Sequence, residues 1–549
     1  MQGKKNFTPK LFTNFCLSDY IPEDNFYKIL KRELDLSFVY KRTQLLYSNT
    51  GKPSIDPVVF FKCMLIGYLE NVCSDRALER HINMRMDLRF FIDHDIDEST
   101  PDHSTFCKTR KRIPIEVFQD VFDHILKLCV DAGLVNGNIQ SIDSAYINAN
   151  ASIDRMTEVK MIDRDPKDYL DELTQHDGNH KIYGHDDEKV ARKRLEKSQR
   201  NLEWFTEMRK AKYTEQDGGS QQRKNKRRFL SNATHMSSTD PDAKVAKKSG
   251  KPRMLCYSSM MSVDTQHHII THMSAEKAHR KDSRYLIKTT KQVKHRLENL
   301  GLRVHNILAD AGFSSGENYH TLNSMNIDAF IPLHGTYKPK REGFDYDPIS
   351  DTYTCSEGQK IEYRQTAKSG GYYKKRYLSK KKQCDKCPLK LECVGKRGYK
   401  KIEHTIYKPE YDEMIKKLKS KNGQESYALR MHTVEPVFGT LQQHYGLRWI
   451  NTRGHDLANK VMLMSAAALN LRKLIKYKAN NPIFNPLAFT TNHIASYFKF
   501  KFMYHSIHHQ QSHNLSYFYA SLETGSMHIM SSRKIGTSHV LIVIVNSLD

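Results

Sequence analysis

A chain of 549 residues is too long for one ordinary hydrophobic core, so two or three domains are expected. Its formal net charge of +25 indicates a polyanionic partner, with nucleic acid as the default, and a simple basic coating protein would not need this length. The sequence has no apolar run of about 18 residues, no signal peptide and no disulfide framework among its ten cysteines. These features argue against a membrane-spanning protein and predict a reducing, cytoplasmic compartment.

Residues 1–135 are expected to be helical. Asp56 and Pro57 predict the start of one helix, with the aspartate as N-cap and the proline in the first turn. A second helix is predicted from Ser74 to Phe91. A third begins at Pro114 and is expected to stop at Gly133.

A short basic helix is predicted between the last two helices, after the turn STPDHS. It either grips DNA or is a solvated basic surface, and the pattern alone does not separate these interpretations. Its cations are Lys108, Arg110, Lys111 and Arg112.

At Gly137 the pattern changes to the alternation of a β-strand, in the sequence GNIQSIDSAYINANAS. Asp143 shares an apolar face of this strand with Ile139, Ala145 and Ile147. A carboxylate on such a face is costly to bury unless it is paired or binds a cation, although a strand-end capping role is the alternative. Residues 156 to about 250 then form a charged insertion with one long helix and a basic run, Arg223 to Phe229.

From Met254 the strand signals return, followed by a helix from about Asp282 to Leu300. A short apolar strand, Val304 to Ala309, ends at Asp310, and a turn, a helix and the strand FIPL come next. This order predicts an α/β sheet. An acid at the carboxyl end of a buried strand is where such folds place their chemistry, while a helix-capping aspartate is the alternative.

A second insertion, residues 335 to about 420, is rich in tyrosine, lysine and glycine and is expected to be β-rich. A Cys-x2-Cys pair with two further cysteines suits tetrahedral zinc, so a structural Zn2+ site is predicted, with reduced free thiols as the alternative. The proposed ligands are Cys355, Cys384, Cys387 and Cys393.

The stretch Tyr427 to Lys473 contains Glu435 in an apolar and basic segment with helical spacing, and it ends in a helix expected to pack on the sheet. Arg430, Arg448 and Arg453 lie near this acid in sequence. Glu435 is either a salt-bridge partner or a metal-binding carboxylate beside a phosphate path.

Asp143, Asp310 and Glu435 thus stand out as three acids, each set in an apolar segment of a basic chain. Converging carboxylates repel one another unless a cation joins them. Two Mg2+ ions about 3.5–4 Å apart would suit such oxygens and clamp a scissile phosphate.

The chain resembles the DDE transposases of bacterial insertion sequences, in the group with a Tyr-Arg-Glu-Lys signature. The resemblance implies a ribonuclease H-like α/β catalytic core with Asp143, Asp310 and Glu435 as catalytic residues and ligands of Mg2+ (or Mn2+). It also implies cut-and-paste transposition by a nucleoid-associated bacterial protein, acting on double-stranded DNA at terminal inverted repeats and target sites, as a homodimer. The matching segments are PDHSTFCKTRKR, SIDSAYINAN, STDPDAK, ILADAGFSSGENY and TVEPVFGTLQQHYGLRWINTRG.

Two departures from the signature concern DNA contact. Four residues separate Arg430 from Glu435 where the group has three, so a regular helix should turn this arginine away from the acid. Gln442 stands at the lysine position and brings no charge to a phosphate. We expect Arg448 or Arg453 to supply the missing contacts.

The sequence therefore predicts a helical DNA-binding domain over residues 1–135, a catalytic domain with its two insertions over 136–478, and a peripheral tail over 479–549. The predicted activity is a metal-dependent DNA transposase that binds insertion-sequence ends, cleaves them and transfers their 3′-hydroxyl ends into target DNA. The alternatives are a transposase-derived DNA-binding protein that has lost cleavage, and a structure-specific nuclease.

Overall fold

The computed structural model describes most of the chain up to Asn480. The basic run from Arg223 to Arg228 and the tail after residue 480, both singled out in the sequence, lie outside the described residues. The described ranges are 15–48, 50–51, 54–161, 163–168, 170, 185–214, 229–247, 250, 252–335, 337–369, 372–395 and 398–480.

The N-terminal region is helical, as predicted. Asp56 accepts hydrogen bonds from the N–H groups of Val58 and Val59 at 2.7 and 3.1 Å, and Pro57 opens the helix, as the capping pattern indicated. The α-helices are α1 (Phe26–Glu33), α2 (Phe38–Thr43), α3 (Pro57–Leu69), α4 (Asp75–Asn83), α5 (Met86–Phe91), α6 (His103–Arg112) and α7 (Ile115–Asp131), with short 3-10 turns η1 (Leu17–Tyr20) and η2 (Gln44–Leu46).

The single helix predicted from Ser74 to Phe91 is wrong, because the chain leaves the helical conformation between α4 and α5. Arg85 has extended backbone angles there. Its guanidinium donates to Glu70 at 2.9 Å and to Asp87 at 2.6 Å. The contact with Glu70, which directly follows α3, helps to hold the break, and local helix propensity alone could not reveal it. The predicted stop after α7 is confirmed, since Gly133 has a φ of 75°.

A six-stranded mixed sheet forms the centre of the part of the chain that the structure describes. The path β6–β5–β1–β7–β8 has antiparallel pairs from β6 to β1 and parallel pairs from β1 to β8, and β4 pairs with the start of β5. The strands are β1 (Ile139–Asn148), β4 (Lys244–Ala246), β5 (Met254–Asp264), β6 (Ile270–Lys277), β7 (Asn306–Ala309) and β8 (Asp328–Phe330).

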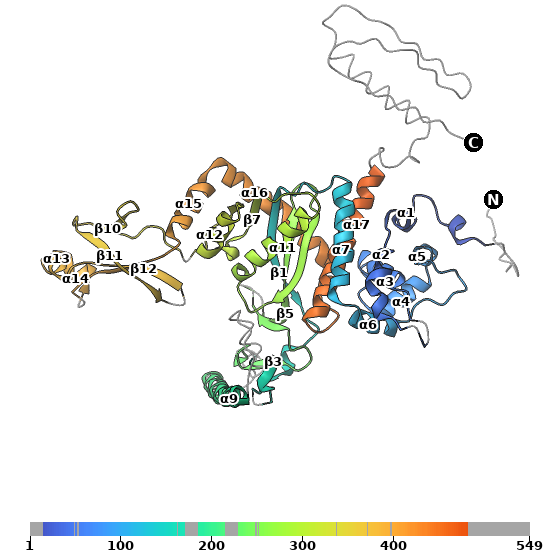
Figure 1. The fold of residues 1–549 in the computed structure, drawn as a ribbon, viewed down its shortest axis with the longest axis horizontal. Coiled ribbons are helices and arrows are strands. Elements are labelled where there is room, and N and C mark those ends of the chain that lie inside the picture. Colours follow the sequence, from blue (N-terminus) through green and yellow to red (C-terminus); the bar gives the residue numbers. More distant parts are fainter. Residues whose placement is uncertain are drawn as a thin grey trace, which may run out of the picture. The chain divides into compact units, whose positions relative to one another are not determined.

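The helix α17 (His455–Asn480) covers the outer edge of this sheet and packs on α7 (Figure 1). The Asn470 side chain accepts from the Ile270 N–H and donates to its carbonyl, at 2.9 and 2.8 Å. The Asn459 amide oxygen accepts from the Ala275 N–H at 2.6 Å. These bonds satisfy backbone groups of β6 that an uncovered edge strand would leave unpaired. The prediction that this C-terminal helix packs on the sheet is confirmed.

Helical segments of different lengths follow the strands. They are η4 (Asp282–Arg284), α11 (Leu286–Glu298), η5 (Ala311–Phe313), α12 (Gly316–Ser324), α15 (Lys408–Lys419) and α16 (Lys421–His444). The charged first insertion contains the predicted long helix, α9 (His185–Thr214), together with η3 (Ile153–Arg155) and the small ladder of β2 (Met156–Glu158) with β3 (His235–Ser237).

The second insertion contains a sheet of its own, in the order β13–β12–β11–β10–β9. Its small core is aromatic, and Tyr353 and Tyr377 each hydrogen-bond one ring nitrogen of His404, at 2.8 and 3.2 Å. Tyr377 also donates to Asp351 at 2.5 Å. Its elements are β9 (Phe344–Asp347), β10 (Thr352–Cys355), β11 (Lys360–Ser369), β12 (Tyr372–Leu378), α13 (Lys381–Asp385), α14 (Lys390–Cys393) and β13 (Lys401–Thr405).

The structural zinc site predicted in this insertion is not supported. Among the described residues, no three of the four predicted ligands bring their sulfur atoms within 4.8 Å of one another. Cys355 packs against the aromatic core from β10, and the Cys384 sulfur lies 3.0 Å from the Ser379 hydroxyl. The hydrogen-bond network of Tyr353, Tyr377, His404 and Asp351 holds the strands of this insertion together. The unsupported ligand set is Cys355, Cys384, Cys387 and Cys393.

No described helix is long and apolar enough to cross a membrane.

Candidate active site

One of the predicted catalytic acids, Asp143, lies on β1, and a second, Asp310, directly follows the neighbouring parallel strand β7. The β1–β7 register pairs Ile142 with Ala309, so Asp143 and Asp310 each come one residue after this last pair. Adjacent strands are about 4.8 Å apart, which brings the two backbones close at this point. The Asp310 side chain also accepts from the Gly312 N–H at 2.9 Å. Asp310 therefore both follows the end of β7 and caps the 3-10 turn η5.

The third acid reaches the same region from α16. The Arg430 guanidinium lies 3.2 Å from Asp143 Oδ2 and 3.6 Å from Glu435 Oε1, so one cation links two of the predicted acids. The Asp143 side chain is 16% exposed and that of Glu435 is 57% exposed. The helix α16 contacts β1, β5 and β7, which explains why residues nearly 300 positions apart in the chain meet here.

The prediction that the altered spacing turns Arg430 away from Glu435 is wrong. The long side chain bridges the helical offset and reaches both Glu435 and Asp143. Arg430 is only 8% exposed, and its Nε atom is buried without a hydrogen-bond partner. A guanidinium in this position neutralises carboxylates rather than facing a phosphate in solvent.

The chemistry of the donors fits a divalent cation, because carboxylate oxygens are the ligands that Mg2+ prefers. The donor atoms of Asp143, Asp310 and Glu435 do not all lie within 4.8 Å of one another. The Arg430 guanidinium contacts both Asp143 and Glu435, and it carries a positive charge, as a metal ion would. Among the described residues, the group whose metal-ligating atoms do lie within 4.8 Å of one another is Glu79, Asp102 and His103, in the helical region.

An acid that the sequence analysis missed lies beside Asp310. A methyl group placed on Gly312 would lie 3.0 Å from Asp310 Oδ1 and 3.5 Å from Asp282 Oδ2, so both carboxylates crowd this glycine. Burial, together with the nearby charge of Asp282, raises the pKa of Tyr146 on β1. In the sequence Asp282 looked like an ordinary helix start, and only the contact between η4 and η5 reveals its place.

The predicted basic contacts in α6 divide into two kinds. Lys108 and Arg112 are exposed. Arg110 is 6% exposed, and its guanidinium donates to Asp75 at 2.7 and 3.1 Å, which fixes α6 against α4. Arg110 therefore supports the packing of the helical region and does not face solvent.

Arg448 and Arg453 are exposed in the connection between α16 and α17. Gln442, at the lysine position of the signature, is half-buried on α16. Arg448 and Arg453 are therefore accessible to a phosphate, whereas Gln442 carries no charge.

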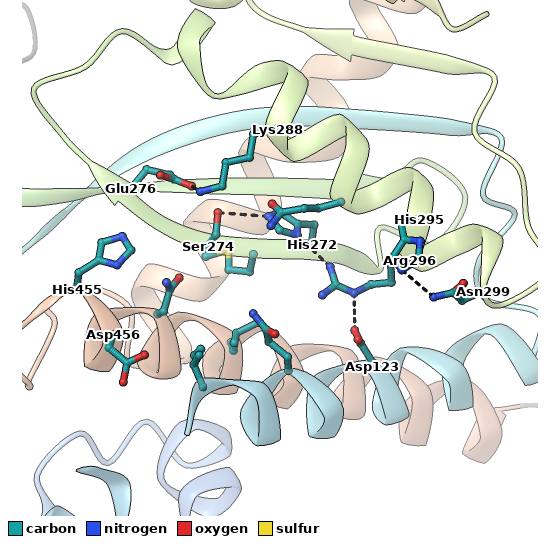
Figure 2. A pocket seen from close by; sticks show the side chains of 16 residues that line it. Asp123, His272, Ser274, Glu276, Lys288, His295, Arg296, Asn299, His455 and Asp456 are labelled. Carbon is teal, nitrogen blue, oxygen red and sulfur yellow. Dashed lines mark hydrogen bonds and ion pairs between the residues drawn. The ribbon is translucent and has the colours of Figure 1, made fainter. Parts of the chain in front are cut away.

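A separate cavity of about 520 Å3 lies between α7, β6, α11 and α17 (Figure 2). Arg296 reaches both Asp123 and the Nδ1 atom of His272, the latter at 2.9 Å, and Lys288 binds Glu276 at 2.5 Å. None of the three predicted acids lines this cavity. Burial and the adjacent Arg296 hold the pKa of His272 well below its usual value, so this imidazole is neutral and structural.

Comparison with known protein families gives two matches. Residues 15–112, which contain α1 to α6, match a family described as a transposase domain (DUF772). Residues 354–475, which contain Glu435, match a family described as a transposase DDE domain. No curated protein matches the chain. The DDE domain implies a nuclease or transferase that generally uses a divalent metal, and the transposase family implies DNA binding. Together, the two matches, both to transposase domains, support a DDE transposase.

Proposed function

We propose that this transposase binds the ends of an insertion sequence, cleaves the DNA there and transfers the freed 3′-hydroxyl ends into target DNA. The observation that carries the proposal is that Asp310 follows the strand next to Asp143, while Arg430 links Asp143 to Glu435. Asp143 lies within β1 and Asp310 directly follows the neighbouring parallel strand β7, whereas Glu435 comes from the helix α16. A protein that only binds DNA has no need for three acids in one place.

The strand order supports a ribonuclease H-like core. Three antiparallel strands, β6, β5 and β1, lead into two parallel ones, β7 and β8. The first acid lies on the central strand and the second at the end of the next, so the topology itself brings them together.

We infer that Asp143, Asp310 and Glu435 hold Mg2+ or Mn2+. Bound metal would activate the attacking hydroxyl and stabilise the leaving oxygen of the phosphodiester. Arg430 would then neutralise Asp143 and Glu435 before the metal arrives, because converging carboxylates repel one another when no cation joins them.

Exposed cations on two parts of the chain would position the DNA. Lys108 and Arg112 project from α6, while Arg448 and Arg453 follow the helix that carries Glu435. Such contacts to phosphates supply affinity and register without reading sequence. We further propose a homodimer, because the two ends of an element must be cut and joined together.

The proposal is tested with a circular plasmid that carries the element and its flanking DNA. Purified protein should cut at the element ends with Mg2+ and fail to cut with EDTA, while still binding the ends in both buffers. Cutting that is unaffected by EDTA would contradict the metal-dependent mechanism. Cutting without preferential binding of the ends would indicate a structure-specific nuclease.

A second candidate function is a DNA-binding protein that has lost cleavage. Gln442 at the lysine position and the salt bridges of Arg430 with two of the acids favour it. The same assay separates the two candidates, because this protein would bind the ends in either buffer and cut in neither.

A further inference from the structure

An exposed tryptophan lies in the connection between α16 and α17. Trp449 is 57% exposed. It follows the exposed Arg448, and the exposed Asn451 and Arg453 come shortly after it. A large exposed aromatic ring on a soluble surface is informative, because such rings are concentrated at binding sites.

The backbone on both sides of this ring is fixed to the central sheet. The Ile450 N–H donates to the carbonyl of Asn148 at 2.8 Å, and the Asn150 side chain donates to the carbonyl of Asn451 at 3.1 Å. Trp449 itself forms a parallel bridge with Asn148, the last residue of β1. The indole is therefore presented by a held backbone, which lowers the entropy that binding would cost.

The same connection is fixed to the helical N-terminal region. The Gly446 N–H donates to the Asn71 side chain at 2.9 Å, and the Asn451 side chain donates to the carbonyl of Cys73 at 2.6 Å. A methyl group on Gly446 would lie 2.8 Å from the Cys73 sulfur, so the packing there is close. The ring thus lies where the helical region meets the strand that carries Asp143.

The chemistry around the ring indicates its partner. The exposed neighbours of Trp449 are cationic or polar, whereas a protein partner would favour a continuous apolar patch. A polyanion with flat apolar faces matches an exposed indole with two exposed arginines, Arg448 and Arg453, within four positions of it in the chain. In an intact duplex the base faces are covered by their neighbours, so a stacking ring needs an unpaired base.

We propose that Trp449 stacks on an unpaired base of the DNA substrate while Arg448 and Arg453 bind the adjacent phosphates. The inference rests on the proposed DNA-cutting function and adds a subsite to it. Asn148 lies five positions after Asp143 on β1, or roughly 17 Å at about 3.3 Å per residue. This separation equals about five base pairs of duplex at 3.4 Å each.

The chain offers a direct optical test, because it contains two tryptophans. Trp204→Phe, on α9, leaves Trp449 as the only source of tryptophan emission. The probes are a 20-nucleotide thymidine strand and a duplex of equal phosphate number whose two ends are closed by hexaethylene glycol linkers, so that it contains no unpaired base. Binding is measured independently from the anisotropy of dye-labelled probes. The single strand should quench Trp449 emission at saturation, and the closed duplex should bind with little quenching.

A second arm measures affinity. Trp449→Leu should weaken binding of the single strand about tenfold, the loss expected for one stacked base, and leave binding of the closed duplex unchanged. Trp204→Leu is the matched control, since Trp204 is 55% exposed and should not affect single-strand binding. If Trp449→Leu fails to fold, the quenching arm still decides the question.

Three results would overturn the inference while leaving the proposed function intact. They are bound single strand without quenching, equal quenching by the closed duplex, and unchanged single-strand affinity in a folded Trp449→Leu variant. Absence of binding to both probes would overturn the proposed function as well.

Discussion

At the scale of single residues, Arg430 neutralises the carboxylates of Asp143 and Glu435. Its guanidinium is buried and lies within 3.6 Å of both Asp143 and Glu435. Removing it would leave Asp143, which is mostly buried, without this neutralising cation. The two carboxylates would then need a different cation.

Arg430→Gln should therefore lower the free energy of unfolding by about 2 kcal/mol in EDTA, less than for a fully buried pair because Glu435 is half exposed. Mg2+ should restore part of this loss by binding the freed acids. Urea unfolding with and without Mg2+ measures both effects, with exposed Arg448→Gln as control. A loss that Mg2+ does not reduce would count against a shared cation site.

His404 links the stability of the second insertion to pH. Burial, with a smaller contribution from the Lys408 charge, lowers its pKa from 6.5 to about 4. The folded state therefore holds neutral imidazole, bonded to Tyr353 and Tyr377. Because the unfolded state takes up the proton first, the contribution is complete above pH 6.5 and is lost as pH falls towards 4.

We expect the urea midpoint of the parent protein to fall more steeply between pH 6.5 and pH 4 than that of His404→Gln. The variant lacks the titrating ring, so the difference between the two curves isolates its effect. Parallel curves across this window would show that His404 is not held neutral by the fold.

At the scale of elements, the connection from α16 to α17 joins the helical region to the sheet. Gly446 allows this with a φ of 69° and close contact to Cys73. Gly301 offers a matched comparison, since its φ is 77° and no atom lies within 4 Å of its missing side chain.

Both Gly446→Ala and Gly301→Ala should cost about 1 kcal/mol from the left-handed backbone. Gly446→Ala should cost more, because its methyl group would meet the Cys73 sulfur at 2.8 Å. Thermal unfolding of the two variants measures the difference. Equal losses would mean that the junction adapts without cost.

Elements whose signals are local could be predicted from the sequence. The cap formed by Asp56 and Pro57 starts α3, and the end of an apolar run places Asp310 after β7. The break at Arg85 could not be predicted, because it depends on Glu70, which directly follows α3. Cysteine spacing was misleading in the same way, since it carries no information about the strands between the cysteines.

The site shows the same division between local and distant information. Asp143, Asp310 and Glu435 could be named because each interrupts an apolar pattern. The contact of Arg430 with Asp143 depends on how α16 crosses β1, and the approach of Asp282 depends on η4 packing near η5. Neither contact can be predicted from the spacing of residues in the sequence.

At the scale of the whole molecule, the net charge of +25 predicts steeply salt-dependent DNA binding. Replacing exposed Lys108, Arg112 or Arg448 by glutamine should each reduce the slope of log Kd against log salt by about 1 if the side chain binds a phosphate. Exposed Lys291→Gln on α11 is the control and should leave the slope unchanged. If all four variants kept the slope of the parent protein, Lys108, Arg112 and Arg448 would not bind phosphates.

The central claim is that Asp143, Asp310 and Glu435 act together in metal-dependent cleavage. The most direct measurement compares Asp143→Asn, Asp310→Asn and Glu435→Gln with Glu425→Gln, an exposed acid on the same helix as Glu435. Each site variant should bind the element ends like the parent and cut them at least about 1,000-fold more slowly, because the amide keeps the shape but loses the charge that holds metal. Glu425→Gln should cut normally. Near-parental cutting by any one of the three site variants would contradict the account.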